Sequence, residues 1–259
     1  SPMDLSMPSA LYRSCCTHAC TPSERITVSS SGQNFTASCN TSAPLYIESA
    51  DKATIMLAAG SVNTLTDATL YVFPNPAEDK PNACIYSSDD MTIKGTGTLN
   101  VNGNYNNGIG CKNDLRIKDC TLNVTGVNNI LKGNDSVEIE NATVKLSGGE
   151  DAIKSDTADR TDKGYILITA GSKVEINCID YAIQATMSIT IEAGCAITGT
   201  CGGDVLNCPG TINADEGAMQ IGSTAQPGCE PLNRKGRDRH AAFNLPPLGG
   251  GCRRETVSD

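Results

Sequence analysis

The chain has 259 residues, 13 cysteines, no tryptophan and a formal net charge of -9. This charge disfavours binding to nucleic acid or to an anionic membrane surface, and it suits cation binding. No run of 18 or more apolar residues occurs, so we expect no segment inserted in a membrane.

Residues 1–42 form the first predicted unit. They carry four cysteines and two early prolines and show no regular alternation of apolar and polar residues. The open end of a repeat protein exposes unpaired strand edges and therefore needs a cover. We expect residues 1–42 to be a cysteine-rich cap tied by disulfides.

From residue 43 to residue 222, short alternating segments recur with a period near 22 residues. Each apolar marker is followed by two short runs, for example Leu115–Ile117 and Leu122–Val124. Such alternation indicates half-buried strands, and the period leaves no room for a crossover helix. The sequence predicts an all-β, single-stranded parallel β-helix (β-solenoid) with about 22 residues per coil. The markers are Ile85, Ile109, Ile130, Ile153, Ile183 and Val205.

Two segments interrupt this period. Residues 67–81 contain three prolines, which exclude a regular strand, so we expect a surface loop there. Residues 156–163 are rich in aspartate and account for the longest interval between markers.

Acidic residues recur at fixed positions after the markers. Asp90, Asp114 and Asp135 each follow a marker by five residues and are expected to stack in one row. Stacked carboxylates repel one another unless a hard cation neutralises them, and calcium accepts such oxygen ligands. The alternative is that these acids only satisfy turn backbone. The predicted calcium ligands are Asp90, Asp114, Asp135, Glu150, Asp151 and Asp156.

Sugar binding usually recruits aromatic rings together with polar groups. A flat solenoid face can also bind an extended polymer through ladders of Asn, Thr and Asp. Each tyrosine can equally be a corner residue that covers a coil. The candidate carbohydrate-binding residues are Tyr86, Asn104, Tyr105, Tyr165 and Tyr181.

The coils contain no histidine, because His18 and His240 both lie in the terminal segments. We therefore expect a protein that is not an enzyme. A polysaccharide lyase is a minor alternative, since it needs a basic residue beside an acidic calcium cluster. Paired carboxylates for glycoside hydrolysis are a further possibility. The available bases are Lys112, Arg116, Lys132 and Lys154.

Cysteines and glycosylation sequons favour a secreted, extracellular glycoprotein, because many cysteines without a CxxC pair indicate an oxidising compartment. Cys178 and Cys201 occupy nearly the same corner in adjacent coils, which predicts a disulfide between them. The sequons begin at Asn34, Asn40, Asn123, Asn134 and Asn141.

Residues 223–259 form a basic segment rich in proline and glycine. Such a composition is typical of a flexible tail, although a disulfide or a neighbouring subunit can hold it in place.

Several strings of residues resemble a bacterial family of carbohydrate-binding domain-containing β-helix proteins. The resemblance spans about residues 43–206. It is carried by Ala50–Leu57, Asn63–Asp67, Ser88–Gly95, Gly97–Ile109, Gly148–Asp156 and Lys163–Ile166. It implies a right-handed parallel β-helix, calcium ions at acidic corners and non-catalytic binding of acidic or cellulosic polysaccharide.

This chain departs from the family's Asp-Asp-Gly-Ile corners at Asn106–Ile109, Val127–Ile130 and Asp180–Ile183. The departures imply that several calcium corners are lost and that Glu150 and Asp151 retain the pattern best. The cysteines and sequons suit a eukaryotic-like version of the family.

Two functions from different classes follow. One is a secreted, non-catalytic module that binds extracellular polysaccharide, possibly together with calcium. The other is a structural subunit of an extracellular fibre or coat, in which copies of the chain join end to end or through their termini and disulfides. Organism, polysaccharide and occupied sequons are not readable from the sequence.

Overall fold

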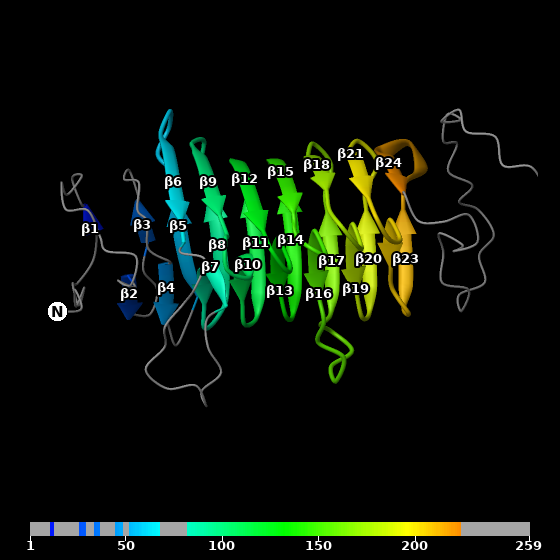
Figure 1. The fold of residues 1–259 in the computed structure, drawn as a ribbon, viewed down its shortest axis with the longest axis horizontal. Coiled ribbons are helices and arrows are strands. Elements are labelled where there is room, and N and C mark those ends of the chain that lie inside the picture. The colour runs from blue at the N-terminus through cyan, green and yellow to red at the C-terminus, as the bar shows by residue number, and fades with distance from the viewer. Residues whose placement is uncertain are drawn as a thin grey trace, which may run out of the picture.

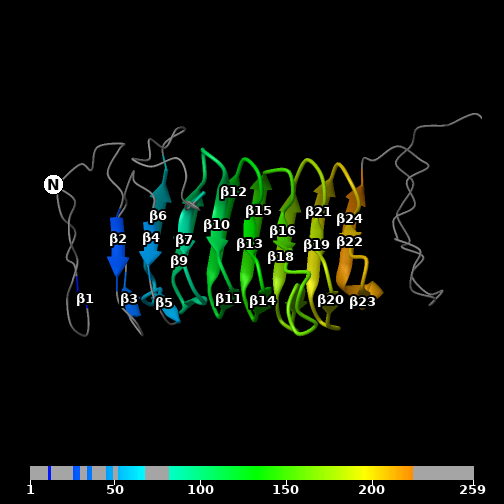
Figure 2. The ribbon, with the colours of Figure 1, turned by 90° about the horizontal axis from the view of Figure 1, so that it is seen from below.

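The computed structural model describes residues 11–12, 26–29, 34–36, 45–48, 52–67 and 82–223. These residues form a parallel β-solenoid of about six turns with ~23 residues per turn. Successive coils stack along the long axis of the molecule (Figures 1 and 2). The predicted all-β solenoid is confirmed.

Three parallel sheets form the sides of the coil. Sheet A contains β1 (Leu11–Tyr12), β3 (Asn34–Thr36), β5 (Ala53–Met56), β8 (Met91–Lys94), β11 (Asp114–Lys118), β14 (Ser136–Glu140), β17 (Tyr165–Ile168), β20 (Ser188–Ile191) and β23 (Thr211–Ala214). Sheet B contains β2 (Ile26–Ser29), β4 (Leu45–Glu48), β7 (Ala83–Ser87), β10 (Asn107–Cys111), β13 (Leu131–Gly133), β16 (Ile153–Ser155), β19 (Ile183–Ala185) and β22 (Leu206–Asn207). Sheet C contains β6 (Val62–Thr66), β9 (Thr98–Asn102), β12 (Thr121–Gly126), β15 (Thr143–Gly148), β18 (Lys173–Asn177), β21 (Ala196–Cys201) and β24 (Met219–Ser223). One short 3₁₀ helix, η1 (Glu216–Ala218), precedes β24.

The core is a set of aliphatic rows that run along the solenoid axis. Every second residue of a strand points inward, and each inward residue lies beside its equivalent in the next coil. In sheet A these equivalents are isoleucines that are at most 2% exposed, which explains why regular alternation produces a continuous core. This row is Ile55, Ile93, Ile117, Ile139, Ile168 and Ile191.

The pairing of strands shows that two of the six predicted marker residues do not belong to the row of equivalent positions. Ile109 pairs with Leu131 and Ile183 pairs with Leu206, so Ile130 and Val205 were each assigned one residue too early. Both are buried corner residues, and burial alone therefore does not distinguish them from the true row. The true row is Ile85, Ile109, Leu131, Ile153, Ile183 and Leu206.

The corner from sheet A to sheet C repeatedly contains a backbone with positive φ. Gly95, Gly171 and Gly194 adopt this conformation without strain, and Asp119 and Asn141 adopt it with φ of 54° and 46°. Asp and Asn tolerate the left-handed region better than other residues that carry a Cβ. The Nδ2 of Asn141 also donates a hydrogen bond to Oδ1 of Asp119 (2.8 Å), which joins the two corners.

Three described strands lie within the predicted cap of residues 1–42. β2 pairs with β4, β3 pairs with β5, and β1 pairs with β3, so the sheets begin before residue 43. The cysteines of residues 1–42 and the whole of residues 224–259 lie outside the described residues, and their disulfides and domain boundaries remain predictions. Within the described ranges, no helix is long and apolar enough to cross a membrane.

Candidate functional site

The outward face of sheet C carries two polar rows that run along the solenoid axis. Inward residues such as Val101 and Val124 are buried, so the residues on either side of them face outward. The first row is Thr64, Asn100, Asn123 and Lys145, on β6, β9, β12 and β15. The second row, on the same four strands, is Thr66, Asn102, Thr125 and Ser147.

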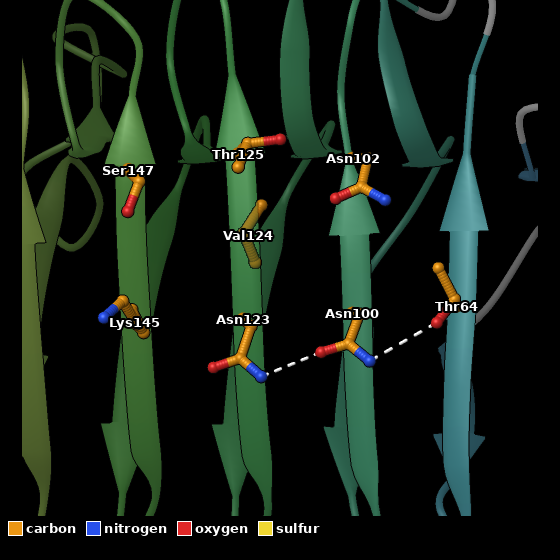
Figure 3. A pocket seen from close by; sticks show the side chains of 8 residues that line it. All are labelled: Thr64, Asn100, Asn102, Asn123, Val124, Thr125, Lys145 and Ser147. Atoms are coloured by element: carbon orange, nitrogen blue, oxygen red, sulfur yellow. Dashed lines mark hydrogen bonds between the residues drawn. The ribbon is translucent and has the colours of Figure 1, made fainter.

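Hydrogen bonds between coils orient the amides of both rows (Figure 3). The Nδ2 of Asn123 donates to Oδ1 of Asn100 (2.8 Å), and the Nδ2 of Asn100 donates to Oγ1 of Thr64 (3.3 Å). In the second row, the Nδ2 of Asn102 donates to Oγ1 of Thr66 (2.9 Å). The side chains are therefore held in place before any ligand arrives.

A shallow groove of ≈ 390 Å³ lies between these rows. Its two walls stand two residues apart on each strand, about 6.6 Å, and Val124 lies between them (Figure 3). Lys145 is the one charged residue of its lining, and its Nζ forms an ion pair with Glu175 (2.9 Å). The lining residues are Thr64, Asn100, Asn102, Asn123, Val124, Thr125, Lys145 and Ser147.

The predicted row of Asp90, Asp114 and Asp135 is wrong at its third member. Asp114 donates its backbone N–H to Oδ1 of Asp90 (3.2 Å), as expected of stacked residues. In the next coil, however, Asp114 pairs with Ser136, and Asp135 lies beside Asn113. The error follows from the marker at Ile130, which shifted the expected register by one residue.

A lysine of the chain neutralises the acids at this place. Lys163 Nζ lies 2.8 Å from Oδ2 of Asp114 and 3.6 Å from Oδ2 of Asp135. The remaining carboxylate oxygens accept from Ser136 Oγ (2.7 Å) and Thr157 Oγ1 (2.9 Å). The hydrogen bond to Asp114 raises the pKa of Lys163, and the charge of Asp135 adds to this effect. In the structure Lys163 thus supplies the positive charge beside these acids, and calcium binding here remains a prediction.

The second predicted calcium group was Glu150, Asp151 and Asp156. Asp156 forms an ion pair with Lys132 (2.7 Å), and Asp151, which is buried, forms one with Lys154 (2.9 Å). Glu150 is exposed. Among the residues that the structure describes, no group of three or more His, Cys, Asp or Glu side chains is arranged to hold a metal ion.

One corner nevertheless concentrates negative charge. Burial raises the pKa of Asp180, and the nearby carboxylates of Asp151, Glu150 and Asp204 raise it further, against a smaller opposing effect of Lys154. This corner lies at the turn from sheet C to sheet B. Added positive charge would therefore be favoured at this corner.

The predicted sugar-binding residues lie on separate parts of the coil. Tyr86 is on sheet B with its ring against Gly110, since a Cβ at Gly110 would lie 3.1 Å from Tyr86 Cδ2. Tyr165 begins β17 and donates its hydroxyl to Glu138 (2.7 Å), and Tyr181 lies in the turn before β19. The five residues do not form one platform.

Two of the five lie close to the sheet C groove in sequence and in space. Asn104 and Tyr105 follow the end of β9. Asn104 is exposed, and its backbone N–H donates to Oδ1 of Asp67 (2.5 Å), the residue after Thr66 of the groove's second row. Asn104 therefore lies close to the end of the groove's second row.

The candidate lyase bases are mostly paired with acids. Arg116 forms an ion pair with Glu138 on the next coil, Lys132 pairs with Asp156, and Lys154 pairs with Asp151. Each of these three cations therefore already has a carboxylate partner within the chain.

The disulfide between Cys178 and Cys201 remains a prediction. The two residues do occupy adjacent coils in matching positions, as the backbone N–H of Cys178 donates to the carbonyl before Cys201 (3.1 Å). Each is nevertheless a thiol. The Sγ of Cys178 donates to Tyr181 O (3.3 Å), and that of Cys201 donates to Gly203 O (3.3 Å), so each thiol is satisfied within its own turn.

The described cysteines are thiols that fill the core. Burial raises the pKa of Cys111 and of Cys120 to about 12, so these thiols are unreactive in the folded chain. An oxidising compartment therefore remains a prediction. The described thiols are Cys84, Cys111, Cys120, Cys178, Cys195, Cys201 and Cys208.

The sequons differ in their surroundings. Asn123 is part of the groove wall and Asn141 is exposed, whereas the hydroxyl residue of the Asn134 sequon, Ser136, is fully buried. Asn34 lies in β3, and Asn40 lies outside the described residues. Whether any sequon carries a glycan remains a prediction.

Sequence reasoning missed the groove residues Thr64, Asn100 and Asn102 and the cation Lys163 as individual positions. The repeated pairs Thr-x-Thr at 64–66, Asn-x-Asn at 100–102 and Asn-x-Thr at 123–125 were a usable signal for the groove. Lys163 had no such signal, because its partners lie 28 and 49 residues away in the sequence.

Comparisons with known proteins agree on one family. The model of a family described as carbohydrate-binding domain-containing protein matches residues 23–226. A carbohydrate-binding domain-containing protein of Acetivibrio thermocellus is 46% identical over 178 residues, which are 69% of this chain and 62% of that protein. The match thus spans less than two thirds of the relative's length.

A solved structure supports the same fold. It is described as the polysaccharide lyase-like protein from C. thermocellum, in a gadolinium derivative. It is 41% identical to this chain, has a TM-score of 0.66, and the match covers 78% of this chain and 79% of that chain.

Proposed function

Since the chain belongs to the family of carbohydrate-binding domain-containing proteins, we propose that it binds polysaccharide in the groove of sheet C. The observation that carries this proposal is the groove itself. Its two walls repeat hydroxyl and amide side chains from coil to coil, and hydrogen bonds fix the amides in one orientation. A polymer of similar sugar units requires such a repeated set of contacts.

The chemistry of the walls suits sugar hydroxyls, which both donate and accept hydrogen bonds. An asparagine amide has two N–H donors and two acceptor lone pairs. Asn100 uses one of each within its row, so one donor and one acceptor remain for a ligand. Because neighbouring amides restrict its rotation, little conformational entropy is lost on binding.

We propose that this binding is non-catalytic. None of the eight residues that line the groove is a carboxylate or a histidine, and its one basic group, Lys145, pairs with Glu175. The groove thus offers no acid and base pair around a glycosidic bond.

A polysaccharide lyase remains the second candidate, because the solved relative is described as lyase-like. Incubation with polyuronide distinguishes the two, since a lyase releases unsaturated sugar ends that absorb ultraviolet light. We expect no such absorbance. Its appearance, and its loss on substitution of Lys154, would establish the lyase.

We include calcium binding in the proposal at one place, the acidic turn from sheet C to sheet B around Asp180. The negative charge of Glu150, Asp151, Asp180 and Asp204 would attract a calcium ion to the turn from sheet C to sheet B, although these side chains do not form a ready-made set of metal ligands. The ion would neutralise the corner and would stiffen the turn from sheet C to sheet B.

Secretion is part of the same proposal, because polysaccharide polymers lie outside cells. The alternative of an extracellular fibre or coat depends on the two terminal segments, which lie largely outside the described residues. Filaments in negative-stain images of the purified chain would favour that alternative.

Affinity gel electrophoresis against a panel of soluble polysaccharides tests the proposed function. We expect at least one polymer to retard the chain. The double variant Asn100→Ala/Asn123→Ala should bind roughly 30-fold more weakly, because it loses two hydrogen bonds to the ligand worth about 1 kcal/mol each.

The matched control is Asn213→Ala, an exposed amide on β23 of sheet A, which should leave binding unchanged. Failure of every polymer to retard the native chain would refute polysaccharide binding. Unchanged binding by the double variant would place the site away from the groove.

A further inference from the structure

We propose that the groove of sheet C selects neutral polysaccharides and holds them lengthwise, with the sugar chain parallel to the solenoid axis. This inference rests on the proposed function and specifies its ligand class and binding direction. The inference is argued from three features of the groove: the charge of its walls, the direction in which its two polar rows run, and the common orientation of its amides.

The walls of the groove carry no net charge. Lys145 is the one ionisable group in the lining, and its partner Glu175 balances it at 2.9 Å. A carboxylated sugar placed here would have to compete with Glu175 for Lys145, the one cation of the lining, and would be repelled by Glu175 itself.

The rest of the chain also disfavours an anionic polymer. Its net charge is -9, and Glu150, Asp180 and Asp204 concentrate negative charge at the corner beyond the sheet C strands. At low salt this field repels a polyanion before contact. Neutral sugars encounter neither obstacle.

The rows define the direction of the ligand. Along the axis, each row continues through four coils that stand about 4.8 Å apart. Along a strand, by contrast, the groove is only as wide as the distance between its two walls, for example from Asn100 to Asn102. The groove is therefore longer along the axis than across it.

The height of one coil is close to the length of one pyranose ring in an extended chain. A chain that lies along the axis thus meets a new pair of polar side chains with each ring. A chain that crosses the rows meets one pair and then leaves the groove.

The amides also share one orientation. Asn123 donates toward Asn100, Asn100 donates toward Thr64, and Asn102 donates toward Thr66, always in the direction of the preceding coil. The three amides thus share one donor direction along the axis, which suits a sugar chain that runs in a single direction.

The first experiment compares hydroxyethylcellulose, a neutral polymer, with polygalacturonate, an anionic one, by affinity gel electrophoresis at low and at high salt. We expect retardation by the neutral polymer that changes less than two-fold with salt, and none by polygalacturonate. Stronger retardation by polygalacturonate that weakens as salt rises would overturn the inference while leaving the proposed function intact. Failure of both polymers and of the wider panel would instead refute the proposed function.

The charge argument has a gain-of-function test. Asn123→Lys adds a cation to the groove wall, so polygalacturonate should begin to retard the variant while hydroxyethylcellulose retards it less. Asn213→Lys on sheet A is the matched control and should not change either polymer's effect. Equal responses of the two variants would contradict a charge-selective groove.

The direction is tested on the native chain with neutral oligosaccharides of increasing length in calorimetry. The four strands β6, β9, β12 and β15 span about 14 Å between the first and the last. We expect the affinity to rise with each added sugar until the ligand spans these strands, and then to level off. Levelling off at two sugars would show that the chain crosses the rows.

Discussion

Asn100 and Asn123 illustrate how asparagine can both link adjacent coils and supply groups for the proposed ligand. Asparagine is depleted in strands, because its side chain competes for backbone hydrogen bonds. Stacked in register, the two amides bond to each other at 2.8 Å instead, which removes that competition. The same stacking leaves donors and acceptors on the surface, so the structural solution also produces the proposed binding groove.

The folded chain disfavours the negative charge of Asp180. Burial and the carboxylates of Asp151, Glu150 and Asp204 raise its pKa above the ordinary value of 3.8. Folding is therefore opposed by this charge above the folded pKa and is unaffected below the unfolded one. The penalty grows as pH rises through that interval.

We expect Asp180→Asn to raise the free energy of unfolding at neutral pH and to have no effect in acid, where both states carry a protonated Asp180. Urea unfolding at the two pH values measures this difference. Calcium should stabilise the native chain more than the variant if it binds at this corner. Equal stabilities of the two chains at neutral pH would show that Asp180 is not destabilising.

The insertion between β16 and β17 is more than a surface loop. Its last residues return Lys163 to Asp114, across 49 positions of sequence, and Thr157 bonds to Asp135. The side chains of Lys163 and Asp135 are only 18% and 15% exposed. The insertion thereby supplies the cation that the stacked acids of two coils need.

We expect Lys163→Met to lower the free energy of unfolding by roughly 1–3 kcal/mol, because two partly buried carboxylates lose their counter-charge. Denaturant unfolding measures the change. In the native chain, the contribution of charged Lys163 to the free energy of unfolding should be complete below the pKa of lysine in the unfolded chain. It should disappear as pH rises through the raised pKa of Lys163 in the folded chain.

A control lies within the same insertion. Arg160 pairs with Asp162 by an ion pair in which both side chains are more than half exposed, so Arg160→Ala should leave stability unchanged. A loss of stability in this variant equal to that of Lys163→Met would mean that the insertion, and not the buried cation, is responsible.

The whole molecule is held together between neighbouring coils. Each strand of sheet C pairs only with the equivalent strands before and after it, and β24 has a single described neighbour, β21. Stability in such a stack is close to a sum of contacts between adjacent coils. Local opening is therefore expected to begin at an end of the stack.

Hydrogen exchange measured by mass spectrometry tests this view. Amides of β12 and β15, which are paired on both sides, should exchange most slowly, and those of β24 should exchange faster. Uniform protection from β12 to β24 would indicate a stack that opens in one cooperative step. The pattern should be the same with and without a chelator, since the coils pair through backbone hydrogen bonds.

The sequence by itself determined the architecture of this protein. Alternation such as that around Ile117 and Ile139, repeated at a near-constant interval, admits only a coil whose aliphatic residues stack, because strands of this length bury no core alone. The acidic corner at Glu150 and Asp151 and the polar ladders were also visible as patterns.

The tertiary structure decided everything that depends on register and on distant partners. Two adjacent residues at a corner, Ile130 and Leu131, are equally buried, so only the backbone pairing shows which one belongs to the row. A one-residue error there separated Asp135 from Asp114, and no pattern predicted that Lys163 would neutralise both. Cys178 and Cys201 lie at matching positions of adjacent coils, and the sulfur of each donates to a carbonyl in its own turn. Spacing along a chain fixes which coil a side chain belongs to, while hydrogen bonding and charge pairing across coils fix what it does there.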